Sequence, residues 1–389
     1  MNRIKIGDAC EILNGFAFRS ENYATSGIRV IRIANVQKGF IEDSTPAFYP
    51  LNSSGLDKYI LEEGDLLMSL TGNVGRVALL GKEFLPAALN QRVACLRLKN
   101  DKITKGYLFH ILNSDFFENQ CIQSSKGVAQ KNMSTEWLKE YEIPLFPLDE
   151  QKKITTILDN VHGIIASRRQ ELQALDNLIK ARFVEMFGDP EFNTKSWQVV
   201  PLEKLCKVGS SKRIYQNEQS QEGVPFWRIS DLVDKMDIGV AESSLFIPEE
   251  KYIELKTSGL VPIAGDILVT SRGTLGRCYI IKKDDRFYFQ DGMISWLSNY
   301  ADSITPLYLQ YLFMMSGFRK QIDGLQAGST VAYLSIAMLK KLQIMVPNKD
   351  TQNNFAAFVE QIDKSKFAVQ KALDEAQLLF DSLMQKYFG

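Results

Sequence analysis

The chain contains one sequence pattern twice, and this internal repeat limits its possible folds more than any other feature. Residues 64–76 (GDLLMSLTGNVGR) match residues 265–277 (GDILVTSRGTLGR), and the offset of 201 positions then holds without a gap to the Phe-Gly dipeptide that ends each copy. Nearer the start of each copy the offset is 196, so that Cys10 matches Cys206 and the second copy carries a five-residue insertion. An ungapped match of this length indicates a duplication and predicts two similar structural units.

The first part of each copy mixes strand-like and helix-like segments. In the first copy, the expected strands are Ile28–Ile33, Asp65–Leu70 and Val93–Leu98, and the expected helices are Thr104–Leu112 and Ser134–Glu140. The strand segments are rich in Val, Ile and Leu and are bounded by Gly or Asn, and Ser134 suits a helix N-cap. Because most strands precede the helices, we predict an α+β class for two domains at 1–147 and 195–347.

The second part of each copy, 148–189 and 348–389, is predicted to be one long helix. Apolar residues recur there at alternating spacings of four and three, which is the pattern of a coiled-coil seam. The seam residues are Ile154, Leu158, Val161, Ile165, Leu172, Leu175 and Ile179 in the first helix, and Phe355, Val359, Ile362, Val369, Leu373, Phe380 and Leu383 in the second. The alternative is a helix that packs on the core of its own domain, although a narrow stripe favours a partner helix.

Two helices of equal length in one chain are natural partners for each other. If they pair as an antiparallel coiled coil, the two α+β domains are related by a pseudo-twofold axis, as are the two strands of duplex DNA. About 33 residues at ~1.5 Å each form a rod of roughly 50 Å, which can hold two DNA-binding domains about one helical turn apart. Because the two copies differ in sequence, we expect a divided, non-palindromic target.

Three polar segments are candidates for DNA contact. The residues proposed are Thr71, Asn73, Arg76, Arg272, Thr274 and Arg277 in the repeated glycine turns; Lys126, Gln130, Lys131, Asn132, Ser329 and Thr330 in the loops before the last short helix of each domain; and Lys212 and Arg213 near the start of the second domain. Amides, hydroxyls and cations of these kinds contact base edges and phosphates. The alternatives are a plain turn with both arginines in structural ion pairs, and solvated loops.

Shared and differing turn residues are expected to have different roles. We expect the two domains to bind different sequences, so residues common to both turns, such as Arg76 and Arg277, favour phosphate contact or scaffolding. Residues that differ, Thr71 against Arg272 and Asn73 against Thr274, are better candidates for base recognition.

The composition excludes several classes of protein. Lys plus Arg and Asp plus Glu both number 46, so a strongly basic polyanion binder is excluded, although a local basic face on a neutral protein is not. Five scattered cysteines and two histidines argue against a zinc site and favour reduced thiols in the cytoplasm. We find no signal peptide, membrane span, Asn/Asp-Pro-Pro-Tyr/Phe motif or phosphate-binding P-loop, and Asp65 and Asp266 suit a turn role. We therefore expect no catalytic site, metal or cofactor in this chain.

The order domain, helix, domain, helix resembles the specificity subunit of type I restriction–modification systems over essentially the whole chain. The resemblance is carried by the Gly-Asp-Leu/Ile-Leu strand with its Gly-x-x-Gly-Arg turn in each copy, by residues 143–151 (IPLFPLDEQ) at the start of the first long helix, and by the Phe-Gly that ends each helix. Residues 344–352 (IMVPNKDTQ) depart from the double-proline Glu-Gln form, which weakens the motif there but not the repeat.

The resemblance implies a function for each part of the chain. Each α+β domain would be a target recognition domain for one half of a bipartite, asymmetric site in double-stranded DNA. The helices would set the spacer and dock two methyltransferase subunits, which bind S-adenosylmethionine and methylate adenine, and motor-nuclease subunits would join them where a system has them. The alternative is a non-catalytic coiled-coil scaffold that binds protein without sequence-specific DNA recognition.

Overall fold

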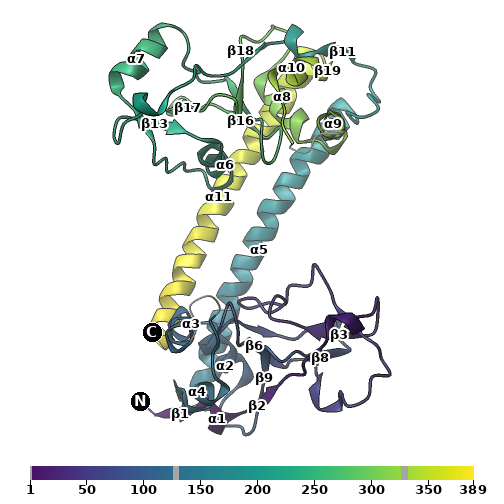
Figure 1. Ribbon diagram of the computed structural model, residues 1–389, viewed down its shortest axis with the longest axis vertical. Helices are drawn as coiled ribbons and strands as arrows, with labels where there is room; N and C mark the ends of the chain where they lie inside the picture. The colour runs from purple at the N-terminus through teal and green to yellow at the C-terminus, as the bar shows by residue number, and fades with distance from the viewer. Residues whose placement is uncertain (1, 126–130, 326–331) are drawn as a thin grey trace. The chain divides into compact units, whose positions relative to one another are not determined.

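The computed structural model describes residues 2–125, 131–325 and 332–389. The chain divides into two compact units, which are described separately below. Unit 1 comprises Met1–Gln170 and Gln370–Gly389, and unit 2 comprises Glu171–Val369. Each unit combines one α+β domain with parts of both long helices, as the colours of Figure 1 make visible.

The domain of unit 1 is built on small, mostly antiparallel sheets. Its strands are β1 (Arg3–Lys5), β2 (Cys10–Asn14), β3 (Ile28–Ile31), β4 (Phe48–Tyr49), β5 (Ile60–Leu61), β6 (Leu66–Ser69), β7 (Val77–Leu79), β8 (Ala87–Leu89), β9 (Val93–Leu98) and β10 (Glu142–Pro144). One sheet has the order β2-β9-β6-β7, a second has the order β4-β3-β8-β5, and β1 pairs with β10. In this domain β3 and β8 pair in parallel, and the other strand pairs of its described residues are antiparallel.

Short helices cover the first of these sheets. They are α1 (Ile6–Ala9), α2 (Lys105–Leu112), α3 (Asp115–Ser124) and α4 (Thr135–Glu140). Thr104 is the N-cap of α2, and its side chain accepts the N–H of Tyr107. Ser134 is the N-cap of α4, and its hydroxyl accepts the N–H of Glu136. These caps satisfy backbone donors that a helix leaves unpaired. The five segments predicted from the first copy are confirmed, since the three strands correspond to β3, β6 and β9 and the two helices correspond to α2 and α4.

Unit 2 repeats this arrangement. Its strands are β11 (Gln198–Pro201), β12 (Lys207–Gly209), β13 (Val224–Trp227), β14 (Phe246–Ile247), β15 (Ile267–Thr270), β16 (Cys278–Ile280), β17 (Tyr288–Phe289), β18 (Ile294–Ser298) and β19 (Gln343–Val346), and its further short helices are α8 (Pro306–Met314), α9 (Ser316–Gly324) and α10 (Ile336–Lys341). The sheet orders are β12-β18-β15-β16 and β14-β13-β17, with β11 paired to β19. The β13–β17 pair is parallel, as is β3–β8 in unit 1.

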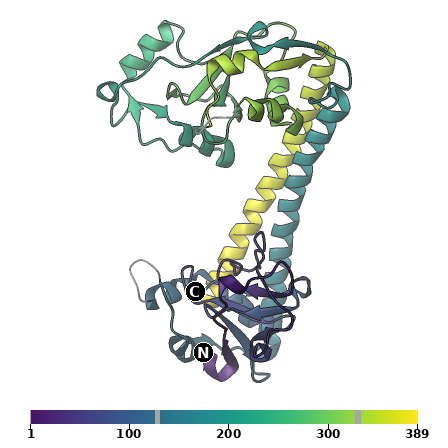
Figure 2. The same ribbon diagram turned by 45° about the vertical axis from the view of Figure 1, so that its right-hand side comes forward.

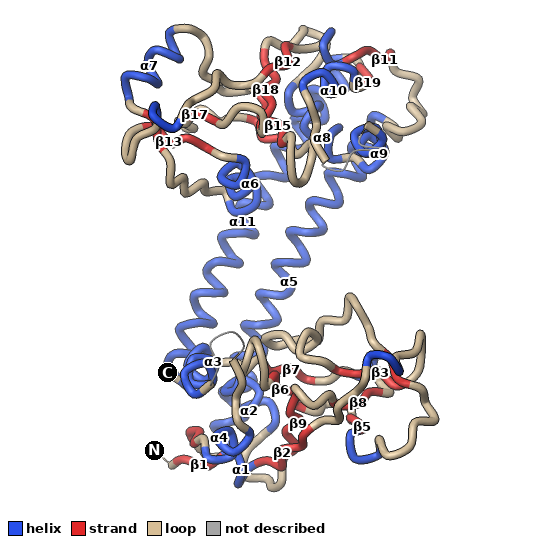
Figure 3. Tube along the Cα trace, in the orientation of Figure 1, coloured by secondary structure: helices blue, strands red, loops and turns tan. Residues whose placement is uncertain are grey.

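Two further helices distinguish unit 2, α6 (Ile229–Ile238) and α7 (Glu249–Thr257). Both lie between residues 228 and 265, where the offset between the copies changes from 196 to 201, and Figure 3 shows them as blue segments of this domain. Helix α6 begins where Asp231 accepts the N–H of Arg228 at 2.8 Å and ends at Gly239, whose φ of 79° suits a glycine C-cap.

The long helices are α5 (Leu148–Phe187) and α11 (Lys349–Phe388). In unit 1, Val161 and Ile165 of α5 pack with Ala376 of α11, and in Figures 1 and 2 the end of α11 lies beside the first half of α5. In unit 2, the end of α5 packs against the beginning of α11 through Phe183 and Phe355, whose ring centroids are 5.5 Å apart. Within each unit the two helices are therefore antiparallel.

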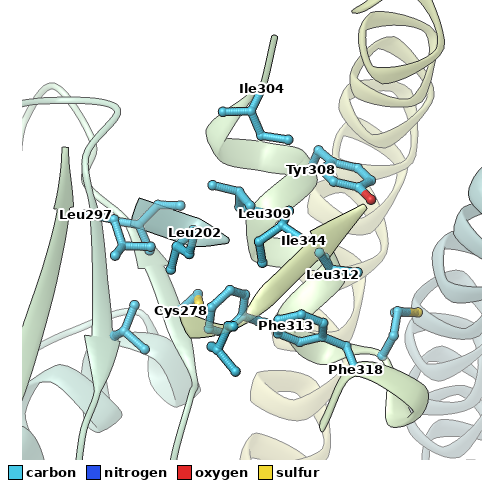
Figure 4. Packing of buried hydrophobic residues seen from close by; sticks show 14 of the residues in the cluster. Leu202, Cys278, Leu297, Ile304, Tyr308, Leu309, Leu312, Phe313, Phe318 and Ile344 are labelled. Atoms are coloured by element: carbon cyan, nitrogen blue, oxygen red, sulfur yellow. The ribbon is translucent and has the colours of Figure 1, made fainter. Parts of the chain in front are cut away.

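All fourteen seam residues are buried or half-buried, but the seam is not formed by two helices alone. In unit 2, Ile179 and Phe355 belong to the same apolar cluster as Tyr308 and Leu312 of α8. Figure 4 shows Tyr308 and Leu312 among the residues of this cluster. In unit 1, Ile154 joins the core of its domain in the same way. The coiled-coil interpretation and its alternative thus each describe part of the helices, because short helices α2 and α8 cover their ends.

Candidate nucleic-acid interface

The repeated glycine turn connects β6 to β7 in unit 1 and β15 to β16 in unit 2. In unit 1 the hydroxyl of Ser69 accepts the N–H of Arg76 at 3.2 Å, and in unit 2 the hydroxyl of Thr270 accepts the N–H of Arg277 at 3.0 Å. Gly75 has a φ of +82°, and a Cβ added there would lie 2.8 Å from the Cβ of Cys121. Both requirements demand glycine, so the turn is a rigid feature of the fold.

The loop before the last short helix lies directly against this turn in both units. In unit 1, Gly72 donates its N–H to the carbonyl of Lys131 at 2.9 Å, and Thr71 forms a β-bridge with Asn132. In unit 2, Leu334 donates its N–H to the carbonyl of Ser271 at 3.0 Å. The structure therefore joins two polar segments that lie about 60 residues apart in the sequence.

The shared arginines of the two turns are held by neighbouring side chains. Arg277 forms an ion pair with Asp237, which is the structural role weighed as an alternative to DNA contact. Arg76 donates instead to the neutral side-chain oxygen of Gln37. Both arginines are half-buried. Asp237 is also affected by this contact, since the hydrogen bond from Arg277 lowers the pKa of its carboxyl.

The candidates near the start of the second domain reach the same region in unit 2. A hollow of about 540 Å³ is lined by Arg213, Arg272, Gln290 and Tyr333, with further apolar side chains. Arg213 donates to Asp291 at 2.8 Å, and the ammonium of Lys212 lies 3.8 Å from Glu254. Thus unit 2 brings residues from all three predicted polar segments to one surface.

The remaining candidates differ in accessibility. Asn73, Lys131, Asn132, Lys212, Arg213, Arg272 and Thr274 are exposed. Thr71 is only 8% exposed, so its side chain presents almost no surface to a duplex. Lys126, Gln130, Ser329 and Thr330 lie outside the described residues.

Sequence reasoning did not select Tyr333, Gln290 or Gln219, all of which line the hollow. No periodicity or motif marks them, because the hollow is assembled from segments distant in the sequence. Tyr333 was detectable only by comparison of the copies, since it stands where the first copy has Asn132.

The paired carboxylates Asp65 and Asp266 have structural partners. Each accepts the backbone N–H of the residue three positions before it, which confirms the predicted turn role. Asp65 also receives two hydrogen bonds from Arg97, and Asp266 receives one from the Trp296 indole at 2.8 Å. Burial raises the pKa of Asp266, although these bonds oppose the shift.

The described residues show neither a metal cluster nor a membrane helix. No group of three or more His, Cys, Asp or Glu side chains in 2–125, 131–325 and 332–389 is placed to hold a metal ion. Over the same residues, no helix combines the length and the apolar character that crossing a membrane requires.

Comparison with known proteins gives the family. The model of the type I restriction modification DNA specificity domain matches the chain twice, at residues 1–177 and 194–376. The chain belongs to this family. Its members are the non-catalytic subunits that give type I restriction–modification systems their DNA sequence specificity, and this chain is a specificity subunit of that kind.

Individual relatives match over most of their length. The specificity subunit of the type I restriction enzyme EcoBI from Escherichia coli is 25% identical, over 99% of this chain and 85% of the relative. The MjaVIII specificity subunit from Methanocaldococcus jannaschii is 26% identical, over 80% of this chain and 77% of the relative. The crystal structure of the type I S subunit from M. genitalium covers 100% of this chain and 96% of its own, with a TM-score of 0.58 and 17% identity, which shows a shared fold.

Proposed function

We propose that each α+β domain of this specificity subunit binds one half of a bipartite, asymmetric site in double-stranded DNA. The observation that carries the proposal is the surface formed in each unit by the glycine turn and the adjoining loop. Exposed Asn73, Lys131 and Asn132 lie on it in unit 1, and exposed Arg272 and Thr274 lie on it in unit 2. Because the two sets differ chemically, the two half-sites are expected to differ in sequence.

Within this proposal the domain limits remain those predicted from the sequence, at 1–147 and 195–347, with helical segments at 148–189 and 348–389. The helices set the number of base pairs between the half-sites. Support comes from the antiparallel packing of α5 and α11 within each unit and from their equal lengths of 40 residues. A stiff pair of helices holds a distance far better than a loop does.

The same helices would dock two methyltransferase subunits. Large apolar side chains are exposed on their outer faces, away from the seam, and a docking partner would cover them. These residues include Ile157, Ile164, Leu178, Phe367, Leu378 and Leu379. S-adenosylmethionine would be bound by the methyltransferase subunits, which would methylate adenine, and motor-nuclease subunits would join the complex in systems that have them.

We further propose that the chain acts in the cytoplasm, where such partners meet chromosomal DNA. All five cysteines are buried and free of disulfides, which suits a reducing compartment. Burial also raises the pKa of each thiol, for example that of Cys10 to about 12, so these cysteines are unreactive core residues.

The proposal is tested with the full chain in complex with its methyltransferase subunits. Methylated DNA from cells that express the complex is sequenced, and the modified adenines are aligned. The expected result is one split motif with two unlike halves and a fixed spacer. Absence of any shared split motif, with an assembled complex, would refute the proposal in favour of a protein-binding scaffold.

A further inference from the structure

Arg272 lines the hollow of unit 2 and differs from three nearby cations of the same unit, of which Arg213 also lines the hollow. Arg213, Lys212 and Arg277 each have a carboxylate within 4 Å, from Asp291, Glu254 and Asp237 respectively. Arg272 has no carboxylate partner among the residues that the structure describes. Its guanidinium is exposed and lies over the ring of Tyr333, with the central carbon 5.4 Å from the ring centroid.

This contact holds the guanidinium at an exposed position beside the hollow, where its N–H donors would face a ligand. A cation over an aromatic face is attracted by the ring quadrupole, and the guanidinium of Arg272 donates no hydrogen bond to any other residue that the structure describes. The turn that carries Arg272 is fixed by Thr270, whose hydroxyl accepts the N–H of Arg277, and by the bond from Leu334 to Ser271. A side chain held in this way loses little conformational entropy when it binds a planar acceptor pair.

Comparison of the two units points to base recognition at this position. At the offset of 201, Arg272 matches Thr71, and Tyr333 matches Asn132. In unit 1 these two residues also touch, through a β-bridge. The backbone bond from Leu334 to Ser271 in unit 2 also matches the bond from Met133 to Leu70 in unit 1. Backbone geometry is therefore kept at this junction while both side chains are replaced, and such a change is expected where two domains of one scaffold recognise different bases.

We propose that Arg272 recognises a guanine in the half-site bound by unit 2, with Tyr333 as its positioning residue. Guanine presents two adjacent acceptors, O6 and N7, in the major groove, and a guanidinium donates to both at once. A phosphate contact carries no sequence information, so it gives no reason for the side chain at this position to differ between the two copies. This inference rests on the proposed function, because it assumes that unit 2 binds a half-site.

The test uses the full chain in complex with its methyltransferase subunits, with R272A, R272Q and, as a matched control, R286Q. Arg286 is an exposed arginine of the same unit that pairs with Glu249 and does not line the hollow. Binding of each complex to a randomised DNA library is sequenced. R272A is expected to lower the preference for guanine at a single position by about tenfold to a hundredfold, while all other positions stay unchanged. R272Q is expected to shift that position towards adenine, since a glutamine amide pairs with adenine N6 and N7.

The role of Tyr333 is tested separately from folding. Y333F keeps the aromatic face and is expected to keep the wild-type motif, whereas Y333L is expected to weaken the preference for guanine at the position that R272A affects. Urea unfolding of each variant shows whether the fold is retained, and Arg272 has no hydrogen bond to another described side chain whose loss would impair folding.

Three outcomes would overturn the inference while leaving the proposed function intact. They are a wild-type motif without an invariant guanine in either half, an unchanged motif for R272A, and a uniform loss of affinity for R272A at every position, which indicates phosphate contact. A wild-type complex with no split motif would instead refute the proposed function itself. R286Q is expected to leave the motif unchanged.

Discussion

The buried side chain of Gln151 accepts the backbone N–H of Thr104 at 2.8 Å, so that the first turn of α5 holds the start of α2. The same amide donates to the carbonyls of Lys102 and Phe146, each at 2.9 Å. In unit 2, Gln352 forms the corresponding bond to Thr305 at 2.8 Å. A single residue type therefore joins each long helix to its domain.

Replacement of Gln151 by leucine should destabilise unit 1 by about 2–3 kcal/mol, because it leaves a buried N–H and two carbonyls without partners. Urea unfolding followed by circular dichroism measures this change. The control is Gln173→Leu, since Gln173 is exposed on the same helix and its side chain, among the residues described, bonds to Asn177 alone. Equal stability of the two variants would show that the buried amide has no structural role.

Replacement of Phe183 by alanine should destabilise unit 2 by about 3–5 kcal/mol. Phe183 is fully buried, and its ring stacks on Tyr308 and meets Phe187 and Phe355. The matched residue in unit 1 is Met384, which is 9% exposed and flexible, so Met384→Ala should cost less, about 2–3 kcal/mol. Thermal unfolding of both variants measures the two losses of stability, and a larger loss for Met384→Ala than for Phe183→Ala would contradict the prediction.

Unit 1 should lose stability as the pH falls below 6.5. His110 is 3% exposed, and burial lowers its pKa below the ordinary value of 6.5, although its hydrogen bond to Asp159 at 2.7 Å opposes this shift. The unfolded chain therefore binds a proton at His110 more readily than the folded chain, so the contribution is complete above pH 6.5 and declines below it.

The measurement is the urea midpoint between pH 7.5 and pH 5.5 for the wild type and for His110→Gln. The glutamine keeps a hydrogen-bonding side chain but does not titrate in this range. The variant should therefore show a flatter dependence on pH than the wild type. Equal slopes for the two proteins would rule out His110 as the titrating group.

Replacement of Phe367 by serine should weaken assembly with the methyltransferase without a loss of stability. Phe367 is 74% exposed on α11, so its removal leaves no cavity, whereas a partner that covers it would lose apolar contact. Co-purification and thermal unfolding test the two effects separately. Val369→Ser is the contrasting variant, because Val369 is buried in the seam and its change should lower stability. Normal assembly of Phe367→Ser would exclude this part of α11 from the docking surface.

The sequence predicted the features that recur along the chain and missed those assembled from separate segments. The seam from Ile154 to Leu383 follows from heptad spacing, because that spacing places side chains on one helical face. Heptad spacing predicts that Phe355 contacts another long helix. It does not predict the second contact that the structure shows, with the side chain of Tyr308 on α8. No periodicity marks the contact between Arg272 and Tyr333 either, since the hollow that they line is formed by segments distant in the sequence.

Seven residues inserted after Gln170 in α5, together with seven after Val369 in α11, should lengthen the spacer of the DNA motif and leave both half-sites unchanged. Both positions lie at the boundary between unit 1 and unit 2. Seven residues preserve the phase of the seam and add about 10 Å of helix, which corresponds to roughly two to three base pairs. The control is an insertion in α5 alone, which leaves the two seams mismatched in length and should impair stability rather than change the spacer. Methylation mapping of the doubly extended complex decides the matter, because an unchanged spacer in a stable complex would mean that the helices do not set the distance.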